Sequence, residues 1–419
     1  MVIRTNIIFL YSDSLRRDFS TCYIIKNKLD EKGFKSIICS RRNLSKFSKI
    51  FIPQKFFIIG QINIIPQEII KNSIKGKTKI YFLPGEGIAD DAEYQVMYPN
   101  DRIYDNINSI FFWGKNPYLW FKNNRKINDI NKLKKTGYNR FPISKAYSEI
   151  SDKNKNKIGF VGRFPMMNDL YDRNSMWFYL IENSMEEVDK NTSRIKAESE
   201  AMFLYLKIFK KIFEESNYII SYRPHPNENL KTYEILSSKY KGRFELNQNH
   251  DVSEWMSECD KIVGIASSSY IDASIQKIPV ICIDEMINIK SSTLKFDPFL
   301  RVVYDYSYNP KDMNDLLKLI FDNDLKATDN LNFKKMVDDN LKGDTSIVFD
   351  KIYSDLSSEL SKSIILDFIN LNILMAMDFI LSIYQKIFNN NSTQFDYSIF
   401  FHKVSDKLKL ITKSINNKY

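Results

Sequence analysis

The sequence has few of the residues that most metal and redox sites need. Its 419 residues include 4 Cys and 3 His, and no two Cys form a CxxC pair. A cysteine-rich zinc site is therefore not expected, and four scattered thiols are typical of a reducing cytoplasm.

Long apolar runs are also missing. No clean run of 18 apolar residues occurs, so the sequence predicts no membrane-spanning segment. The first residues, MVIRTNIIFLYSD, lack the long apolar region and the cleavage site of a signal peptide, and they are typical of a first strand. We therefore expect a cytoplasmic protein.

Positive charge is present in excess and is concentrated in one segment. Lys and Arg outnumber Asp and Glu by 61 to 51. Between Lys115 and Lys157, twelve basic residues stand against three acids, so this segment alone carries +9. Such a segment indicates an anionic partner, which could be nucleic acid, lipid headgroups or an acidic glycan. A solvated connection between domains is the equally open alternative.

Short apolar runs alternate with helical segments through most of the chain. The runs lie at residues 3–10, 34–39, 56–59, 79–83 and 109–113, and again at 157–162, 217–222, 243–246, 261–265 and 279–283. This alternation predicts two α/β domains with parallel sheets. We place the first domain at residues 1–150 and the second at residues 151–355.

The last part of the chain, residues 356–419, is predicted to be a helical tail. Residues 364–388 are strongly apolar, but Asp367, Asn370 and Asp378 fall on one narrow stripe. Polar groups are costly inside a spanning helix, so this helix either packs on the domains, joins an oligomer or lies on a membrane surface. Five Lys against one Asp in the last 19 residues favour an anionic surface, such as the cytoplasmic face of the inner membrane.

A His and an Arg lie close together after one of the predicted strands. The segment YRPHPNE at 222–228 follows the run at 217–222, and ligands bind at the carboxyl ends of parallel strands. Two prolines restrict the backbone around His225. Arg223 can donate two hydrogen bonds to a phosphate, and His225 can donate one or transfer a proton. The alternative is a surface loop with an incidental His.

Three hydroxyl groups follow another predicted strand. Ser267, Ser268 and Ser269 lie between the run at 261–265 and a predicted helix. Hydroxyls and backbone N–H groups at the start of a helix can bind an anion. Ordinary helix capping is the alternative, although it accounts for only one of the three serines.

An acid between two glycines follows a strand of the first domain. The segment PGEGIADD at 84–91 comes after the run at 79–83. The glycines allow a sharp turn that would expose Glu86 to the predicted interdomain cleft, where it could act as a general base. Asp90 is a second candidate that could equally cap a helix. The alternative for the whole segment is a turn with a solvated acid.

Taken together, these segments resemble a known group of bacterial transferases that use CMP-activated 3-deoxy-ulosonic acids. Capsular polysialyltransferases and related sialyltransferases carry similar motifs in the same order, here Glu86-Gly87, His225-Pro226 and Ser267 to Ser269. The chain also resembles the surface-carbohydrate β-Kdo transferases, through Arg17-Asp18, the segment FFWG at 111–114 and the segment RPHP at 223–226. The likeness extends to about residue 350 and leaves the tail out.

The resemblance implies the GT-B fold, in which two Rossmann-like domains face a cleft. It implies a metal-independent glycosyltransferase that moves a sialic acid or Kdo-type sugar from its CMP donor to a glycan acceptor of the capsule or lipopolysaccharide. The donor would be bound by Arg223, Pro226 and the three serines, with His225 at the leaving phosphate.

The resemblance leaves the stereochemistry open. In the sialyltransferase pattern Glu86 would deprotonate the acceptor, although Gly85 stands where a second acid often precedes it. In the β-Kdo branch a carboxylate nucleophile gives retention, and Glu86, Asp169 and Asp172 are the candidates.

Two other functions fit part of the pattern. A polyol-phosphate transferase of the CDP-glycerol type shares the HP and serine motifs, but it usually has a second His in the first domain, and His250 and His402 lie elsewhere. A non-catalytic, polyanion-binding scaffold of the GT-B type is the other. No recognisable DNA- or RNA-binding motif accompanies the basic segment, so nucleic acid is not expected as a partner.

Overall fold

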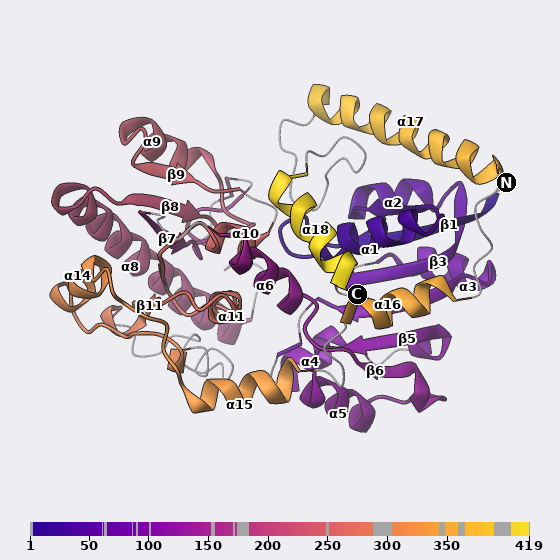
Figure 1. The fold of residues 1–419 in the computed structure, drawn as a ribbon, viewed down its shortest axis with the longest axis horizontal. Helices are drawn as coiled ribbons and strands as arrows, with labels where there is room; N and C mark the ends of the chain where they lie inside the picture. The colour runs from indigo at the N-terminus through magenta and orange to yellow at the C-terminus, as the bar shows by residue number, and fades with distance from the viewer. Residues whose placement is uncertain are drawn as a thin grey trace. The chain divides into compact units, whose positions relative to one another are not determined.

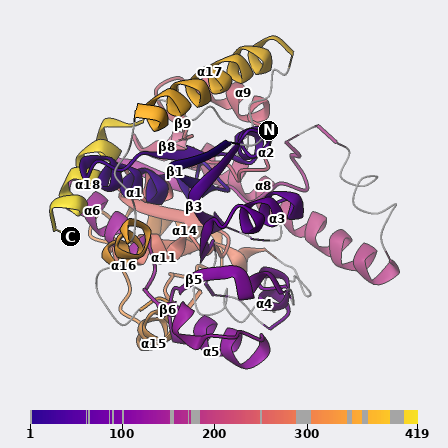
Figure 2. The same cartoon turned by 90° about the vertical axis from the view of Figure 1, so that its right-hand side faces the viewer.

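The chain folds into two compact α/β units. The computed structural model describes residues 3–60, 62, 65–85, 87–88, 91–99, 102–151, 156–170, 172–173, 184–248, 251–287, 304–342, 348–358, 365–388 and 404–418. Unit 1 consists of Met1–Ala146 and Met336–Tyr419, and unit 2 consists of Tyr147–Lys335. Figure 1 shows the chain as a ribbon, and Figure 2 shows it turned by 90°.

Unit 1 is built on a six-stranded parallel sheet with the strand order β2-β1-β3-β4-β5-β6. Its strands are β1 (Ile3–Ser12), β2 (Ser36–Cys39), β3 (Phe51–Gly60), β4 (Lys79–Pro84), β5 (Ile107–Phe112) and β6 (Leu133–Lys135). The strands are rich in Ile and Phe because both faces of a parallel sheet are covered by helices. All five apolar runs predicted for this half are strands.

Helices from both ends of the chain cover this sheet. They are α1 (Phe19–Glu31), α2 (Arg41–Phe47), α3 (Gln67–Lys75), α4 (Asp91–Met97), α5 (Lys115–Asn124), α6 (Phe141–Glu149), α16 (Val348–Ser357), α17 (Ile365–Phe388) and α18 (Asp406–Lys418). The last residues of α6 belong to unit 2.

The basic segment, residues 115–157, contributes to the fold of unit 1 and is not simply a solvated connection between domains. Its residues form α5 and β6, and Phe121 and Leu133 are in the core of unit 1. Several of its charges also have internal partners. Arg125 donates to the backbone oxygen of Tyr98, and Lys134 pairs with Asp355. The periodicity missed β6 because the strand has only three residues, two of which are Lys.

Unit 2 repeats the plan with five parallel strands in the order β11-β10-β7-β8-β9. They are β7 (Lys157–Val161), β8 (Ile219–Arg223), β9 (Phe244–Leu246), β10 (Lys261–Gly264) and β11 (Val280–Cys282). The helices are α8 (Met185–Glu215), α9 (Lys231–Lys239), α10 (Val252–Met256), α11 (Tyr270–Ile275), α14 (Met313–Phe321) and α15 (Leu331–Asn340), the last of which ends in unit 1.

Each sheet has one point where the chain reverses its direction of winding. In unit 2, β8 and β9 lie on one side of β7, whereas β10 and β11 lie on the other. In unit 1 the same change occurs between β1 and β3, because β2 lies on the far side of β1. Ligands of open α/β sheets bind outside the carboxyl ends of the strands at such a switch point.

A buried lysine on a strand holds the end of a helix in each unit. Lys55 on β3 is 0% exposed, and its ammonium group donates to the backbone oxygens of Asp355, at 3.0 Å, and Ser358, at the end of α16. Lys261 on β10 is 3% exposed and donates to the backbone oxygens of Ile320 and Asp322, each at 2.7 Å, at the end of α14. A cation at the carboxyl end of a helix satisfies its last carbonyls.

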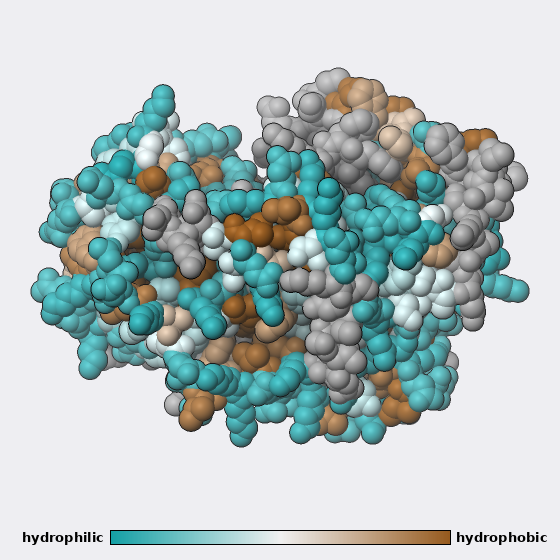
Figure 3. Space-filling model, in the orientation of Figure 1, coloured by the Kyte–Doolittle hydropathy of each residue, from teal (hydrophilic) through white to brown (hydrophobic). Residues whose placement is uncertain are grey.

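The tail does not form a separate part, because it returns to unit 1. Unit 2 ends at Lys335, earlier than the predicted boundary at residue 355. Asp350 of α16 pairs with Lys28 of α1 at 2.9 Å, and Asp378 of α17 accepts from Asn43 of α2 at 2.7 Å. These polar contacts hold α16 against α1 and α17 against α2, which belong to unit 1. In Figure 3, apolar residues reach the surface where Figure 1 places α17.

Among the described residues, no helix is both long enough and apolar enough to cross a membrane.

Replacing Lys261 tests the helix-capping role of the buried lysines. We expect Lys261→Met to lower the free energy of unfolding by about 2 kcal/mol, because the carbonyls at the end of α14 lose a charged donor. Lys318→Met is the matched control, since the Lys318 side chain is 80% exposed on α14 itself. Chemical denaturation of both variants measures the difference, and equal loss in both would contradict this role.

Candidate functional site

Four loops of unit 2 are joined at the carboxyl edge of its sheet. The N–H of Gly162, after β7, donates to the carbonyl of Arg223, at the end of β8, at 2.7 Å. Arg163 donates to the carbonyl of Ala266, after β10. The N–H of Ala266 in turn donates to Asp284, after β11, at 3.1 Å. The RPHPNE and serine segments, which the sequence placed at strand ends, are thus linked through the loop after β7.

A buried carboxylate fixes the loop that carries His225. Glu228 is 1% exposed, and its Oε1 accepts from the N–H of His225 at 2.7 Å and from the N–H of Phe164 at 3.0 Å. Its Oε2 accepts from the hydroxyls of Tyr222, at 3.0 Å, and Tyr233. Burial raises the pKa of Glu228, and the four hydrogen bonds oppose that shift. Glu228 is part of the segment YRPHPNE, but the sequence alone assigned it no role.

The imidazole of His225 is partly exposed and has a defined orientation. Its Nδ1 accepts from the N–H of Asn227 at 3.2 Å. In the neutral ring that geometry puts the proton on Nε2, which makes Nε2 a hydrogen-bond donor. Pro226, beside it, is also partly exposed. The ring can therefore donate to an anionic ligand without first gaining a proton.

Two arginines lie at this edge in different surroundings. Arg223 is 7% exposed, donates to Asn247 at 3.1 Å and lies 5.9 Å from the ring centroid of Trp255. Arg163 is less buried and lies between β7 and β10, at the switch point. Arg163 comes directly after a predicted strand, but no motif in the sequence distinguishes it. The geometry makes Arg163 a second candidate for an anion ligand.

The serine segment forms a turn that leads into α11. The hydroxyls of Ser267 and Ser269 are 2.9 Å apart, and Ser268 is exposed. Ser269 is the first capping residue of α11, but its side chain makes no capping hydrogen bond. Since α11 has only six residues, its dipole is small. The predicted anion site would thus depend on hydroxyl and N–H donors of the turn.

The two candidate nucleophiles of unit 2 are engaged with other groups. Asp169 is 5% exposed, and its oxygens accept from Arg173 Nε at 2.8 Å and Arg173 Nη2 at 2.6 Å. Asp172 is exposed, has a positive φ of 56° and accepts from Asn229. The Asp169 carboxylate is thus paired within the loop after β7, and that of Asp172 joins this loop to Asn229, whereas a nucleophile needs a carboxylate directed at the sugar. Their catalytic role stays a prediction.

The EG segment is only partly covered by the structure. Glu86 and Asp90 lie outside the described residues. Gly87 is buried against the indole of Trp113, and its carbonyl accepts from the hydroxyl of Tyr94 at 3.1 Å. Trp113 Nε1 also donates to the carbonyl of Pro84 at 3.1 Å. Pro84 and Gly87, which stand on either side of Glu86 in the sequence, therefore both contact the indole of Trp113.

A charged cluster that the sequence analysis did not predict lies at the switch point of unit 1. Asp13, after β1, is 4% exposed and accepts from Tyr11 at 2.8 Å and from Arg41 at 3.0 Å. Arg17 lies 3.5 Å from Asp13 and also pairs with Asp18.

Two glycines make room for this cluster. A Cβ on Gly60, which has a φ of 123°, would lie 2.6 Å from Asp13 Cβ. A Cβ on Gly85 would lie 2.8 Å from Arg17 Nη2. The loop after β4, which leads into the EG segment, therefore lies beside this cluster. The only sequence signal was the Arg17-Asp18 pair.

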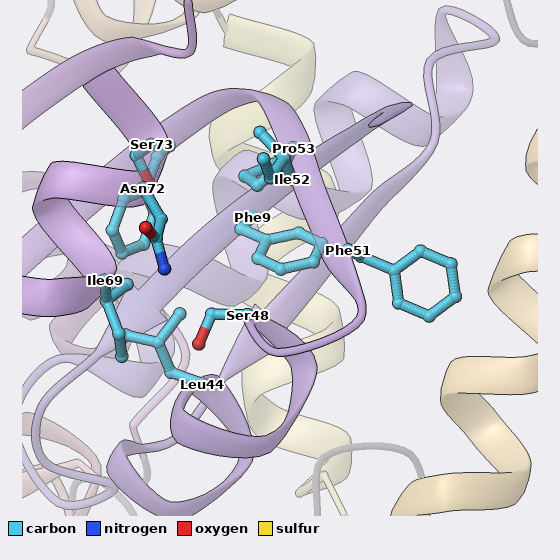
Figure 4. A pocket seen from close by; sticks show the side chains of 10 residues that line it. Phe9, Leu44, Ser48, Phe51, Ile52, Pro53, Ile69, Asn72 and Ser73 are labelled. Atoms are coloured by element: carbon cyan, nitrogen blue, oxygen red, sulfur yellow. The ribbon is translucent and has the colours of Figure 1, made fainter. Parts of the chain in front are cut away.

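Two further features of the described residues provide no chemical centre. No group of three or more His, Cys, Asp or Glu side chains among them is placed to hold a metal ion. Figure 4 shows a small pocket in unit 1 whose lining carries no ionisable side chain. It is lined by Phe9, Leu44, Ser48, Phe51, Ile52, Pro53, Phe56, Ile69, Asn72 and Ser73.

Comparison with known proteins identifies the fold but no sequence family. No protein-family model matches the chain, and no curated protein sequence matches it. The wall teichoic acid polymerase TagF is similar in structure, with a TM-score of 0.53 and 13% identity over 86% of this chain and 90% of that one. Its H548A variant gives a TM-score of 0.50 at 12% identity, over 84% of this chain and 89% of the other.

A UDP-N-acetylglucosamine 2-epimerase from Neisseria meningitidis also matches, over 84% of this chain and 99% of that one, with a TM-score of 0.47 and 10% identity. At that score it adds nothing to the assignment, which rests on TagF. The chain has the α/β architecture of the GT-B fold, with two Rossmann-like units and a helical C-terminal region.

Glu198, which binds the loop after β7, is expected to make the stability of the fold depend on pH. Its Oε2 accepts from the N–H of Met166 at 2.8 Å, and burial raises the pKa of Glu198 from 4.5 to about 7. An acid with a raised pKa stabilises the fold most below the pKa of the unfolded chain, and this contribution is lost as the pH rises. We expect the free energy of unfolding to fall by up to roughly 3 kcal/mol between about pH 4.5 and about pH 7.

Thermal unfolding across this pH range measures the effect. Glu198→Gln keeps an oxygen for the Met166 N–H and removes the titration, so its curve is expected to be flatter. Glu214→Gln on the same helix is the control, since the Glu214 side chain is 52% exposed. Parallel pH curves for the wild type and Glu198→Gln would contradict the assignment.

Proposed function

We propose that the chain is a glycosyltransferase that moves a sialic acid or Kdo-type sugar from its CMP donor to a bacterial surface glycan. One observation carries the proposal. The RPHPNE loop follows β8 and the serine loop follows β10, and these strands flank β7 in one sheet. The loop after β7 bonds to both. Donors for a phosphate are therefore gathered where an α/β sheet of this kind binds its ligand.

The reaction needs a donor to the leaving phosphate and a base at the acceptor. Nε2 of His225 donates a hydrogen bond to the phosphate of CMP while the bond between the phosphate oxygen and the anomeric carbon breaks. Arg163 and the serine hydroxyls share the charge that develops on that phosphate. The acceptor hydroxyl forms the new bond to the anomeric carbon, and its proton passes to Glu86. No step requires a metal ion.

The acceptor belongs to unit 1 in this proposal. Arg17 and Arg41 beside Asp13 provide two guanidinium groups for the carboxylate or phosphate of an acidic glycan. Their place at the switch point between β1 and β3 supports this role. The enzyme would work in the cytoplasm on a glycan under construction.

A second candidate is the transfer of a polyol phosphate from CDP-glycerol. The similarity in fold to TagF, a wall teichoic acid polymerase, is the observation that favours it. The two reactions share a product, because attack on the β-phosphorus of CDP-glycerol also releases CMP. They differ in whether the acceptor oxygen attacks the anomeric carbon of a sugar or a phosphorus atom.

Release of CMP tests both candidates in one assay. The protein is incubated with CMP-sialic acid, CMP-Kdo or CDP-glycerol, with and without short capsular or lipopolysaccharide acceptors. We expect acceptor-dependent release from one of the two CMP-sugars. His225→Ala is expected to lower kcat about 100- to 1000-fold, because the leaving phosphate loses its donor. Lys231→Ala, at an exposed position close to this loop, is the control.

Release from CDP-glycerol alone would assign the second candidate. Background release from all three donors with every acceptor would overturn the proposal, as would wild-type turnover in His225→Ala.

Glu86 is tested by separating binding from turnover. We expect Glu86→Ala to lower kcat at least about 100-fold while CMP binding, measured by calorimetry, stays unchanged, because the base acts only on the acceptor. Asp91→Asn is the matched control, since Asp91 is an exposed acid of the same segment that accepts from Trp120. Unchanged turnover in Glu86→Ala would contradict this role and would move it to Asp90, the second candidate of the segment.

A further inference from the structure

α17 is attached to unit 1 by a face that carries two polar side chains. Asn370, Leu374 and Asp378 lie at steps of four residues and are 3%, 0% and 0% exposed. Asp378 Oδ1 accepts from Asn43 Nδ2 at 2.7 Å, and Leu374 belongs to the core of unit 1. The polar stripe that the sequence predicted is therefore the face by which this helix is attached.

The opposite face of α17 is apolar and exposed. Ile369, Ile373, Ile380 and Ile383 are 50%, 42%, 64% and 42% exposed. Their spacing places them on one side of a 24-residue helix that is roughly 36 Å long. A surface helix of a water-soluble domain normally has the reverse arrangement. Figure 3 shows brown, apolar surface where Figure 1 draws α17.

Two segments of unit 1, one bonded to α17 and one that follows it in the chain, are basic. Residues 41–49, which comprise α2 and the turn after it, contain four basic residues and no acid, and Lys46 and Lys49 are exposed. This segment is joined to α17 by the Asn43–Asp378 hydrogen bond. α18 contains four Lys and one Asp, with Lys409 and Lys413 exposed.

We propose that α17 lies in the plane of an anionic lipid bilayer, with its isoleucine face inserted among the acyl chains near the headgroups. An apolar helix face beside clusters of Lys and Arg is the pattern that binds such surfaces. The hydrogen bond of Asp378 to unit 1 keeps the helix parallel to the surface and attached to the domain. This inference does not depend on the reaction proposed above.

A second copy of the chain fits the same face less well. In a two-fold dimer through α17, the same patch of both copies forms the interface, so residues 41–49 and α18 of both copies would add their positive charge near it. Like charges would then face like charges. An anionic bilayer supplies the opposite sign.

Co-sedimentation with lipid vesicles tests the proposal. We expect the full chain to bind vesicles that contain about 30% phosphatidylglycerol, to bind pure phosphatidylcholine vesicles at least about tenfold more weakly, and to be released as salt screens the lysines. The triple change Ile373→Ser, Ile380→Ser and Ile383→Ser is expected to lower binding at least about tenfold, because it removes the inserted side chains. Lys46→Glu with Lys49→Glu is expected to weaken binding to the anionic vesicles alone.

The control removes exposed apolar side chains from unit 2. Phe203→Ser with Ile235→Ser changes residues that are 65% and 70% exposed and should leave binding unchanged. Thermal unfolding checks that each variant folds. Equal vesicle binding by the triple variant and the control would overturn the proposal. So would light scattering that finds a dimer which the triple variant abolishes, without vesicle binding, since the face would then bind a second copy.

Discussion

The carboxylate of Glu228 is the constraint on which the candidate site of unit 2 depends. It is 1% exposed, and its oxygens accept from two backbone N–H groups and two tyrosine hydroxyls. A buried carboxylate is tolerated only where such donors surround it, so it fixes the spacing between the loops after β7 and β8. A Cβ on Gly162 would lie 2.7 Å from Pro224 Cα and 2.9 Å from Glu228 Oε1, which leaves no room for a larger residue. The RPHPNE segment thus contains its own anchor, three residues after the His that it holds.

Most of the fold follows from the order of apolar runs in the sequence, and the differences have physical causes. All ten runs are strands of two parallel sheets. β3 begins at Phe51, before the predicted run. Its first part was missed because Lys55 interrupts the apolar pattern, although Lys55 is buried and binds the end of α16. α1 begins only at Phe19, although Asp13 and Ser14 are also residue types that cap helices, because Asp13 accepts from Tyr11 and Arg41 instead. The return of the tail to unit 1 depends on side-chain pairs such as Lys28 with Asp350, which periodicity cannot reveal.

Because ligands bind at strand ends, the sequence predicted the RPHPNE and serine segments as parts of the site. The same rule did not identify the residues that lie next to them. Arg163 also follows a predicted strand, but its importance comes from the position of β7 between β8 and β10, which depends on the order of the strands in space. Asp13, Arg17 and Arg41 were missed for the same reason. Asp13 and Arg17 follow β1 whereas Arg41 follows β2, so they meet only because β1 and β2 are paired. For Arg223 the motif predicted more than the structure supports. The motif suggests a phosphate ligand, whereas the guanidinium group is buried and donates to Asn247.

α17 shows why a helical pattern does not decide its own orientation. The spacing of Asn370 and Asp378 places both on one face, and the usual rule would turn that face toward water. Asn43 lies 335 residues earlier in the chain, and it provides the donor that makes burial of Asp378 favourable. Once that face is buried, the geometry of the helix leaves the isoleucines outside. Because the inner face holds α17 on unit 1, the outer face can be covered or uncovered without rearranging the sheet on which it rests. An attachment through this face would therefore leave the carboxyl edge with Asp13 and Arg17 unchanged.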